Sequence, residues 1–98
     1  MAVYAVTYHY TDDSAGRDEH RSAHKEFLSE LGRRGINMCS GPFGPQEAAG
    51  ALLLISATSR DEAVACTEED PFRRHGLVAE VTVREWVPLL GRLAGELA

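Results

Sequence analysis

A histidine on the apolar side of a predicted helix is the first residue of this chain that could do chemistry. His24 precedes Leu28 by four residues and Leu31 by seven, a spacing that puts all three on one helical face. Such a histidine is either a helix-start residue satisfied by a neighbour or a general acid or base partly withdrawn from solvent. Arg21 lies one turn earlier on the same side, where its charge could meet an anion.

The segment Asp70-Pro71-Phe72 is the second candidate. Proline disfavours helical geometry in the residue before it, so Pro71 is expected to end a helix and to fix the direction of the Asp70 carboxylate. Such an aspartate is either a turn or capping residue or a carboxylate that orients an imidazole and selects its tautomer. Phe72 would then belong to the core or to the wall of the site.

Metal and cofactor chemistry have weaker support. His20 and His24 are four residues apart, but no third ligand stands at a spacing typical of zinc sites. One histidine without a further signal is also a poor indication of haem. The chain has no P-loop, Rossmann fingerprint or serine nucleophile elbow. We therefore expect no metal and no other cofactor.

The elements that must position these residues follow from hydrophobic periodicity and turn residues. The pattern predicts, in order, a strand over 3–10, a helix from about 17 to 31, strands over 36–40 and 50–57, a helix from 60 to about 69, a strand over 77–86 and a helical tail over 89–98. The first six elements have the order β-α-β-β-α-β, which is typical of the α+β ferredoxin-like fold, an antiparallel sheet with two helices on one face.

Length and composition limit the classes of function. With 98 residues the chain is predicted to be one domain, with a core over about 3–88. Its 10 basic and 15 acidic residues give a net charge of −5, which argues against nucleic acid and against an anionic membrane as partners. The chain contains only two cysteines and no signal-peptide pattern, so a cytoplasmic location is expected.

Two segments suggest contacts beyond the predicted core. The strand over 50–57 is apolar at almost every position, so both of its faces should be covered. A second subunit would cover the face without helices, and we expect a homodimer. The tail carries Leu89, Leu90, Leu93 and Leu97 and is predicted to dock by this leucine face, because so short a helix is unstable alone.

Taken together, these residues resemble the YciI-like (YCII-domain) family over about residues 3–88. The resemblance rests on Arg21-x-x-His24-x-x-Phe27-Leu28, Ser40-Gly41-Pro42, Asp70-Pro71-Phe72, Gly76-Leu77 and Trp86. It implies a ferredoxin-like dimeric α/β-barrel with a His–Asp active site in a cleft, at His24 and Asp70. One branch of the family is similar to a dehydrochlorinase that acts in the breakdown of chlorinated hydroxyquinols. This chain departs from the common pattern in its short loop over 43–47 and its tail.

Two hypotheses remain open. The first is a cofactor-independent acid/base enzyme, a lyase or isomerase that acts on a small cyclic oxygenated compound. In it, His24 moves a proton and Asp70 orients the imidazole. The residues expected to contact the substrate are Arg21, Ser40, Gly41 and Phe72. The alternative is a non-catalytic module of the same fold that binds a small ligand or serves in assembly, because fold alone does not decide function.

Overall fold

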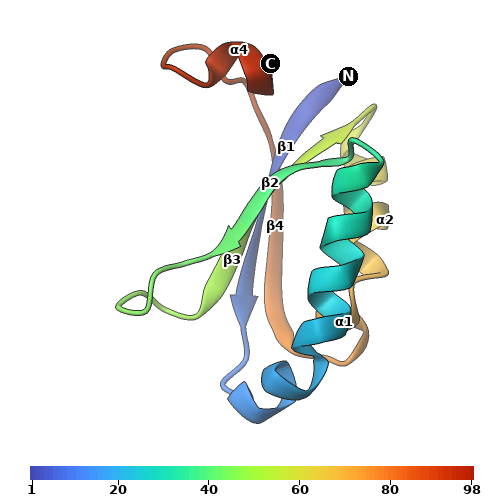
Figure 1. The fold of residues 1–98 in the computed structure, drawn as a ribbon, viewed down its shortest axis with the longest axis vertical. Coiled ribbons are helices and arrows are strands. Elements are labelled where there is room, and N and C mark those ends of the chain that lie inside the picture. The colour runs from blue at the N-terminus through green and yellow to red at the C-terminus, as the bar shows by residue number, and fades with distance from the viewer.

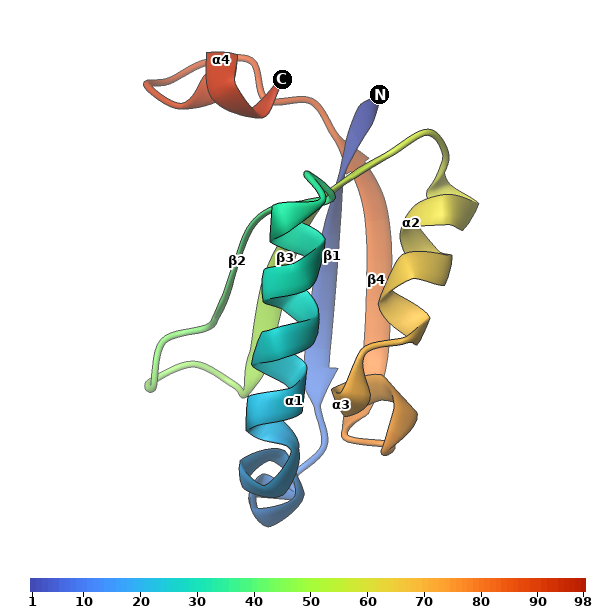
Figure 2. The same cartoon turned by 45° about the vertical axis from the view of Figure 1, so that its right-hand side comes forward.

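Four strands form a single antiparallel sheet in the order β2-β3-β1-β4. The computed structural model describes all residues from 1 to 98. Its elements are β1 (Ala2–Tyr10), α1 (Ser14–Arg33), β2 (Asn37–Pro42), β3 (Gly50–Ala57), α2 (Arg60–Glu68), α3 (Pro71–Arg74), β4 (Val78–Trp86) and α4 (Ala94–Leu97). Helices α1, α2 and α3 lie on one face of the sheet (Figures 1 and 2). The predicted ferredoxin-like α+β fold is confirmed.

The core lies between the sheet and these helices, and it follows from alternation along the central strands. In β3, Leu53 and Ile55 point toward the helices and are fully buried. They pair in register with Val6 and Tyr4 of β1, so side chains of one face meet across the ladder. Leu52, which precedes Leu53 and points to the opposite face of the sheet, is 38% exposed, because no helix covers that face.

Helix α1 starts three residues earlier than the periodicity predicts. The carboxylate of Asp13 accepts a hydrogen bond from the Gly16 backbone N–H at 2.8 Å, which satisfies one of the free donors of the first turn. The helix ends at Arg33, and Gly35 follows with a φ of 75°, a conformation that glycine adopts without strain. Within α1, His24 and Leu31 are the buried residues.

The junction after α2 contains a short helix that the sequence did not predict. Because Pro71 follows it, Asp70 has an extended backbone with φ −60° and ψ 126°. Proline is also favoured in the first helical turn, and the chain continues directly into α3, with Asp70 as its N-cap. The segment therefore ends one helix and begins the next.

Strand β2 contains a bulge and is longer than predicted. Asn37 pairs with Ile55, whereas Cys39 pairs with the adjacent Leu54, so Met38 is an extra residue in the ladder. The strand continues through Pro42, where a turn was expected. Pro42 is tolerated there because β2 lies at the edge of the sheet.

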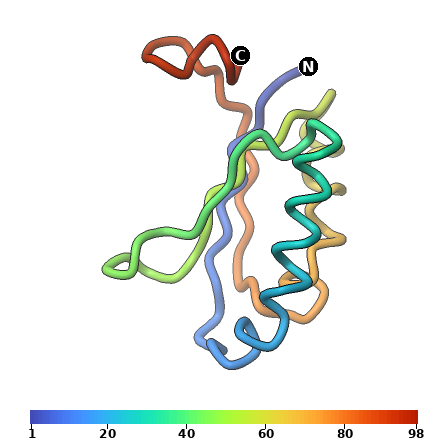
Figure 3. The backbone as a smooth tube through the Cα atoms, in the orientation of Figure 1, coloured from blue at the N-terminus to red at the C-terminus, as the bar shows by residue number.

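The tail differs most from expectation. The predicted helix over 89–98 is a single turn, Ala94–Leu97, and Leu89 and Leu90 precede it. Leu90 is 90% exposed and Leu89 78%, so the leucine side chains do not dock onto their own chain as predicted. The tail lies at the end of the sheet that also holds the N-terminus (Figure 3). None of the helices has the length and apolar character that a membrane span requires.

Candidate active site

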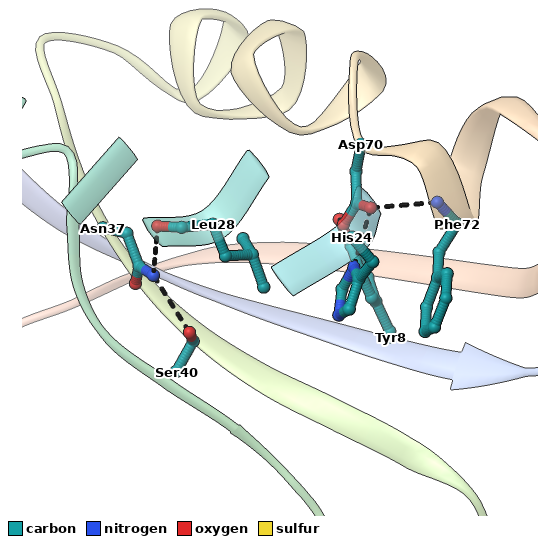
Figure 4. A network of polar contacts seen from close by, with 7 residues as sticks. All are labelled: Tyr8, His24, Leu28, Asn37, Ser40, Asp70 and Phe72. Carbon is teal, nitrogen blue, oxygen red and sulfur yellow. Dashed lines mark hydrogen bonds and ion pairs between the residues drawn. The ribbon is translucent and has the colours of Figure 1, made fainter. Parts of the chain in front are cut away.

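His24 and Asp70 meet although 46 residues separate them in the sequence. The Nδ1 atom of His24, on α1, lies 2.8 Å from Oδ1 of Asp70, at the start of α3 (Figure 4). Asp70 is completely buried and His24 is 8% exposed. An ionised carboxylate only accepts hydrogen bonds, so Nδ1 carries the proton, and Nε2 is left as the nitrogen available to a ligand.

Two further donors hold the Asp70 carboxylate in place. The backbone N–H of Phe72 donates to Oδ1 at 2.9 Å, and the hydroxyl of Tyr8, on β1, donates to Oδ2 at 2.9 Å. Both oxygens are thus engaged by groups from three different elements. The capping role and the histidine-orienting role, which the sequence presented as alternatives, are both performed by one side chain.

Tyr8 is a member of the site whose contact with Asp70 the sequence did not predict. Burial raises the pKa of its hydroxyl far above the ordinary value, and the nearby Asp70 charge raises this pKa further. The phenol therefore stays protonated and remains a donor to the carboxylate. An aromatic residue in a strand is expected to pack in the core or to line a cleft, and neither role specifies a hydrogen-bond partner.

One aromatic ring packs directly against the imidazole. The His24 ring stacks on Phe72, with centroids 3.8 Å apart and planes 1° from parallel. Phe72 in turn meets the edge of Tyr10 at 5.5 Å. This packing makes His24 a buried part of the structure, whereas the sequence suggested only partial withdrawal from solvent.

A cavity of about 580 Å³ opens beside this pair, between α1, β2 and β3. The residues predicted to contact a substrate all line it together with His24, namely Arg21, Ser40, Gly41 and Phe72. The charged side chains among its lining residues are Arg21 and Lys25, and no carboxylate lines it. The cavity wall is therefore basic although the chain carries a net charge of −5. Arg21 also contacts Asp18.

Asn37 lines the cavity, and the sequence did not single it out. Its Nδ2 group donates to the backbone carbonyl of Leu28 at 3.2 Å and to Oγ of Ser40 at 3.0 Å (Figure 4). Its Oδ1 atom is buried and has no hydrogen-bond partner. A buried acceptor without a donor is uncommon in folded proteins.

The remaining candidates for metal chemistry do not gather around His24. The ring of His20 stacks on His75 of the loop after α3, with centroids 3.7 Å apart. No group of three or more His, Cys, Asp or Glu side chains is placed to hold a metal ion.

Comparisons with known proteins connect this geometry to a family. Residues 1–87 match the YCII-related domain. The fold is similar to that of 5-chloro-2-hydroxyhydroquinone dehydrochlorinase from Burkholderia phenoliruptrix AC1100, solved in complex with 2,5-dihydroxybenzoquinone. The TM-score is 0.72 and the sequence identity 25%, over 86% of this chain and 92% of the dehydrochlorinase chain. No curated protein matches the sequence.

Proposed function

The chain belongs to the YCII-related family, and on that premise we propose that it is a cofactor-independent acid/base enzyme. Its reaction would be a lyase or isomerase reaction on a small cyclic oxygenated compound. The observation that carries the proposal is the 2.8 Å contact between His24 and Asp70 at the wall of the cavity. A carboxylate that holds an imidazole in one tautomer is a recurring arrangement for proton transfer.

The site residues expected from the sequence each have a defined role in this proposal. His24 accepts or delivers a proton through Nε2, and Asp70 stabilises the imidazolium that forms. Arg21 or the backbone of Ser40-Gly41 stabilises the negative charge that develops on a substrate oxygen. Phe72 fixes the plane of the imidazole through their stacked contact.

The similarity to a dehydrochlorinase supports elimination as the reaction class. In the keto tautomer of a chlorinated hydroxyhydroquinone, a base can remove the proton of a conjugated ring hydroxyl. The O–H electrons then form a carbonyl, the adjacent double bond shifts, and the C–Cl bond breaks with its electron pair on chloride. The products are a quinone, a proton and chloride, so no external oxidant is needed. His24 is the base in this scheme.

The test is turnover of 5-chloro-2-hydroxyhydroquinone, followed by chloride release and by quinone absorbance. We expect His24→Gln to lower the rate by about 10²–10⁴-fold, the usual contribution of a positioned acid or base. Asp70→Asn should lower it to a similar extent, because the amide favours the wrong tautomer. The matched control is His75→Gln, which changes an exposed histidine outside the cavity and should leave the rate unchanged.

The binding-module alternative predicts a different outcome of the same experiment. The compound would bind, no chloride would be released, and His24→Gln would change only its affinity. A wild-type rate that equals the rate of the His24→Gln variant would contradict the enzyme proposal.

We also propose that the protein is a homodimer and that it resides in the cytoplasm. The sheet face without helices carries apolar side chains, among them Leu52 and Trp86, which are 38% and 42% exposed. A second copy would bury them, as in a dimeric α/β-barrel. Both cysteines are unpaired, which supports a reducing compartment.

A further inference from the structure

The cavity wall near Leu28 contains hydrogen-bonding capacity that the proton-transfer scheme does not use. Asn37 and Ser40 both line the cavity, and they are joined by a hydrogen bond of 3.0 Å from Asn37 Nδ2 to Ser40 Oγ. The side-chain oxygen of Asn37, Oδ1, is buried and has no hydrogen-bond partner. Desolvating an acceptor without replacing its hydrogen bond costs free energy, so this atom calls for a donor that the protein does not supply.

The orientation of the Asn37 amide follows from its surroundings. The backbone carbonyl of Leu28 can only accept a hydrogen bond, so the NH2 group must face it, as the 3.2 Å contact shows. Turning the amide over would place Oδ1 against that carbonyl oxygen. Oδ1 is therefore the free acceptor. Ser40 Oγ accepts from Asn37, which leaves the Ser40 hydroxyl hydrogen available as a donor.

The bulge at Met38 is what brings the two side chains together. Asn37 and Ser40 pair with Ile55 and Leu53, both of which point toward the helices. In a regular strand, residues three apart point to opposite faces. The extra residue turns both polar side chains to the cavity side, which is a known use of bulges beside functional sites.

We infer that Asn37 and Ser40 together bind a hydroxyl group of the ligand, which donates to Asn37 Oδ1 and accepts from Ser40 Oγ. This inference rests on the proposed function and specifies its substrate class. A hydroxyl can both donate and accept, whereas a carbonyl or ether oxygen has no hydrogen for Oδ1 and an ammonium group accepts nothing from Ser40.

The residue of α1 that Asn37 contacts, Leu28, lies about one helical turn from His24. Leu28 follows His24 by four residues on α1, which is about 6 Å along a helix axis. One six-membered ring with its substituents can span that separation. The substrate is therefore a hydroxylated ring compound whose recognised hydroxyl lies across the ring from the group that exchanges a proton with His24, and Asn37 is a specificity-determining residue.

The experiment compares two neutral probes that contain no chlorine and differ by a single hydroxyl, phenol and benzene. Their dissociation constants are measured by NMR titration of the ¹⁵N-labelled protein without oxygen. We expect the wild type to bind phenol about tenfold more tightly than benzene, since one buried hydrogen-bond pair is worth about that factor. In Asn37→Leu this ratio should fall to about one or two.

Two further variants keep the experiment decisive. Ser40→Ala removes the proposed donor and keeps the Asn37–Leu28 hydrogen bond, so it should lower the ratio even if Asn37→Leu does not fold. Ser29→Ala changes another lining hydroxyl and should leave the ratio at the wild-type value. A wild-type ratio near one would overturn the inference, since a buried water would then be the partner of Oδ1. An unchanged ratio in Ser40→Ala would also overturn it. Because this readout is binding alone, chloride release with a flat ratio refutes only the hydroxyl site. A tenfold ratio of the two dissociation constants in a protein that shows no turnover refutes only the proposal that the protein is an enzyme.

Discussion

At the scale of single residues, the site is built around a buried negative charge. Asp70 is fully buried, and an isolated carboxylate in such a place would be strongly destabilising. Three hydrogen-bond donors offset the cost of burying it, namely the Tyr8 hydroxyl, the Phe72 backbone N–H and the His24 imidazole. These donors also fix its orientation, so that stabilisation of the charge and positioning of the imidazole have the same cause.

Tyr8→Phe tests the contribution of the buried phenol through pH. Burial raises the pKa of Tyr8 in the folded state, so above about pH 10, the pKa of an unfolded tyrosine, the unfolded chain loses a proton that the folded chain keeps. The free energy of unfolding should fall by about 1.4 kcal/mol per pH unit for this group. Urea titrations from pH 8 to 11 should give a shallower fall in Tyr8→Phe.

At neutral pH the same variant should be less stable by about 1–3 kcal/mol, because Oδ2 of Asp70 loses its donor. Tyr10 and Cys66 also have pKa values raised by burial, but they are present in both proteins and cancel in the comparison. Equal slopes for the two proteins would show that Tyr8 does not keep its proton in the folded state.

The sequence could predict some of these residues and not others. His24 and Asp70 were predictable because each breaks a local pattern, one on an apolar helix face and one before a proline. Tyr8 and Asn37 break none, since an aromatic residue in a strand and an asparagine near a turn are ordinary. Their roles depend on strand pairing and on the Met38 bulge, which involve residues distant in the sequence.

At the scale of elements, the close approach of β1 and β3 depends on a missing side chain. A Cβ atom on Gly50, at the start of β3, would overlap the backbone carbonyl oxygen of Tyr8 and crowd the Phe43 ring. A side chain at Gly50 would push β3 away from β1 at Tyr8, the residue whose hydroxyl donates to Asp70. Periodicity predicted the bounds of β3 correctly but gave no indication of this contact.

Gly50→Ala should destabilise the protein by about 1–3 kcal/mol, the usual cost of overpacking, because backbone cannot move aside as a flexible side chain can. Thermal or chemical unfolding measures the change. Gly41→Ala in β2 is the matched control, since a Cβ there meets nothing within 4 Å, and its stability should stay within about 0.5 kcal/mol of the wild type. A similar loss in both variants would contradict the proposed overlap.

At the scale of the whole molecule, the helices cover one face of the sheet and leave the other uncovered (Figure 1). Leu52 and Trp86 are partly exposed on the uncovered face, and the leucines of the tail at the end of the sheet are exposed as well. The sequence predicted an apolar second face from the composition of the strand over 50–57. It could not predict the conformation of the tail, because leucine spacing does not specify which surface receives the side chains.

Leu54→Glu tests the proposed homodimer. Leu54 alternates with the buried Leu53 and Ile55 and so lies on the uncovered face, where a buried, unpaired carboxylate would oppose association. Sedimentation at micromolar concentration should show a dimer for the wild type and a monomer for the variant. Ala23→Glu, on the exposed side of α1, should remain dimeric. A wild type that sediments as a stable monomer would refute the proposal.

The three hydrogen bonds of Asp70 also affect which residues should persist as related chains diverge. A related chain that lost the reaction would still need a carboxylate here, because the Tyr8 hydroxyl and the Phe72 amide would remain buried and would need their acceptor. The imidazole is different, since any side chain that can donate one hydrogen bond and stack on a ring would satisfy the fold. In diverging lineages the aspartate should therefore outlast the activity, and the histidine is the better marker of it.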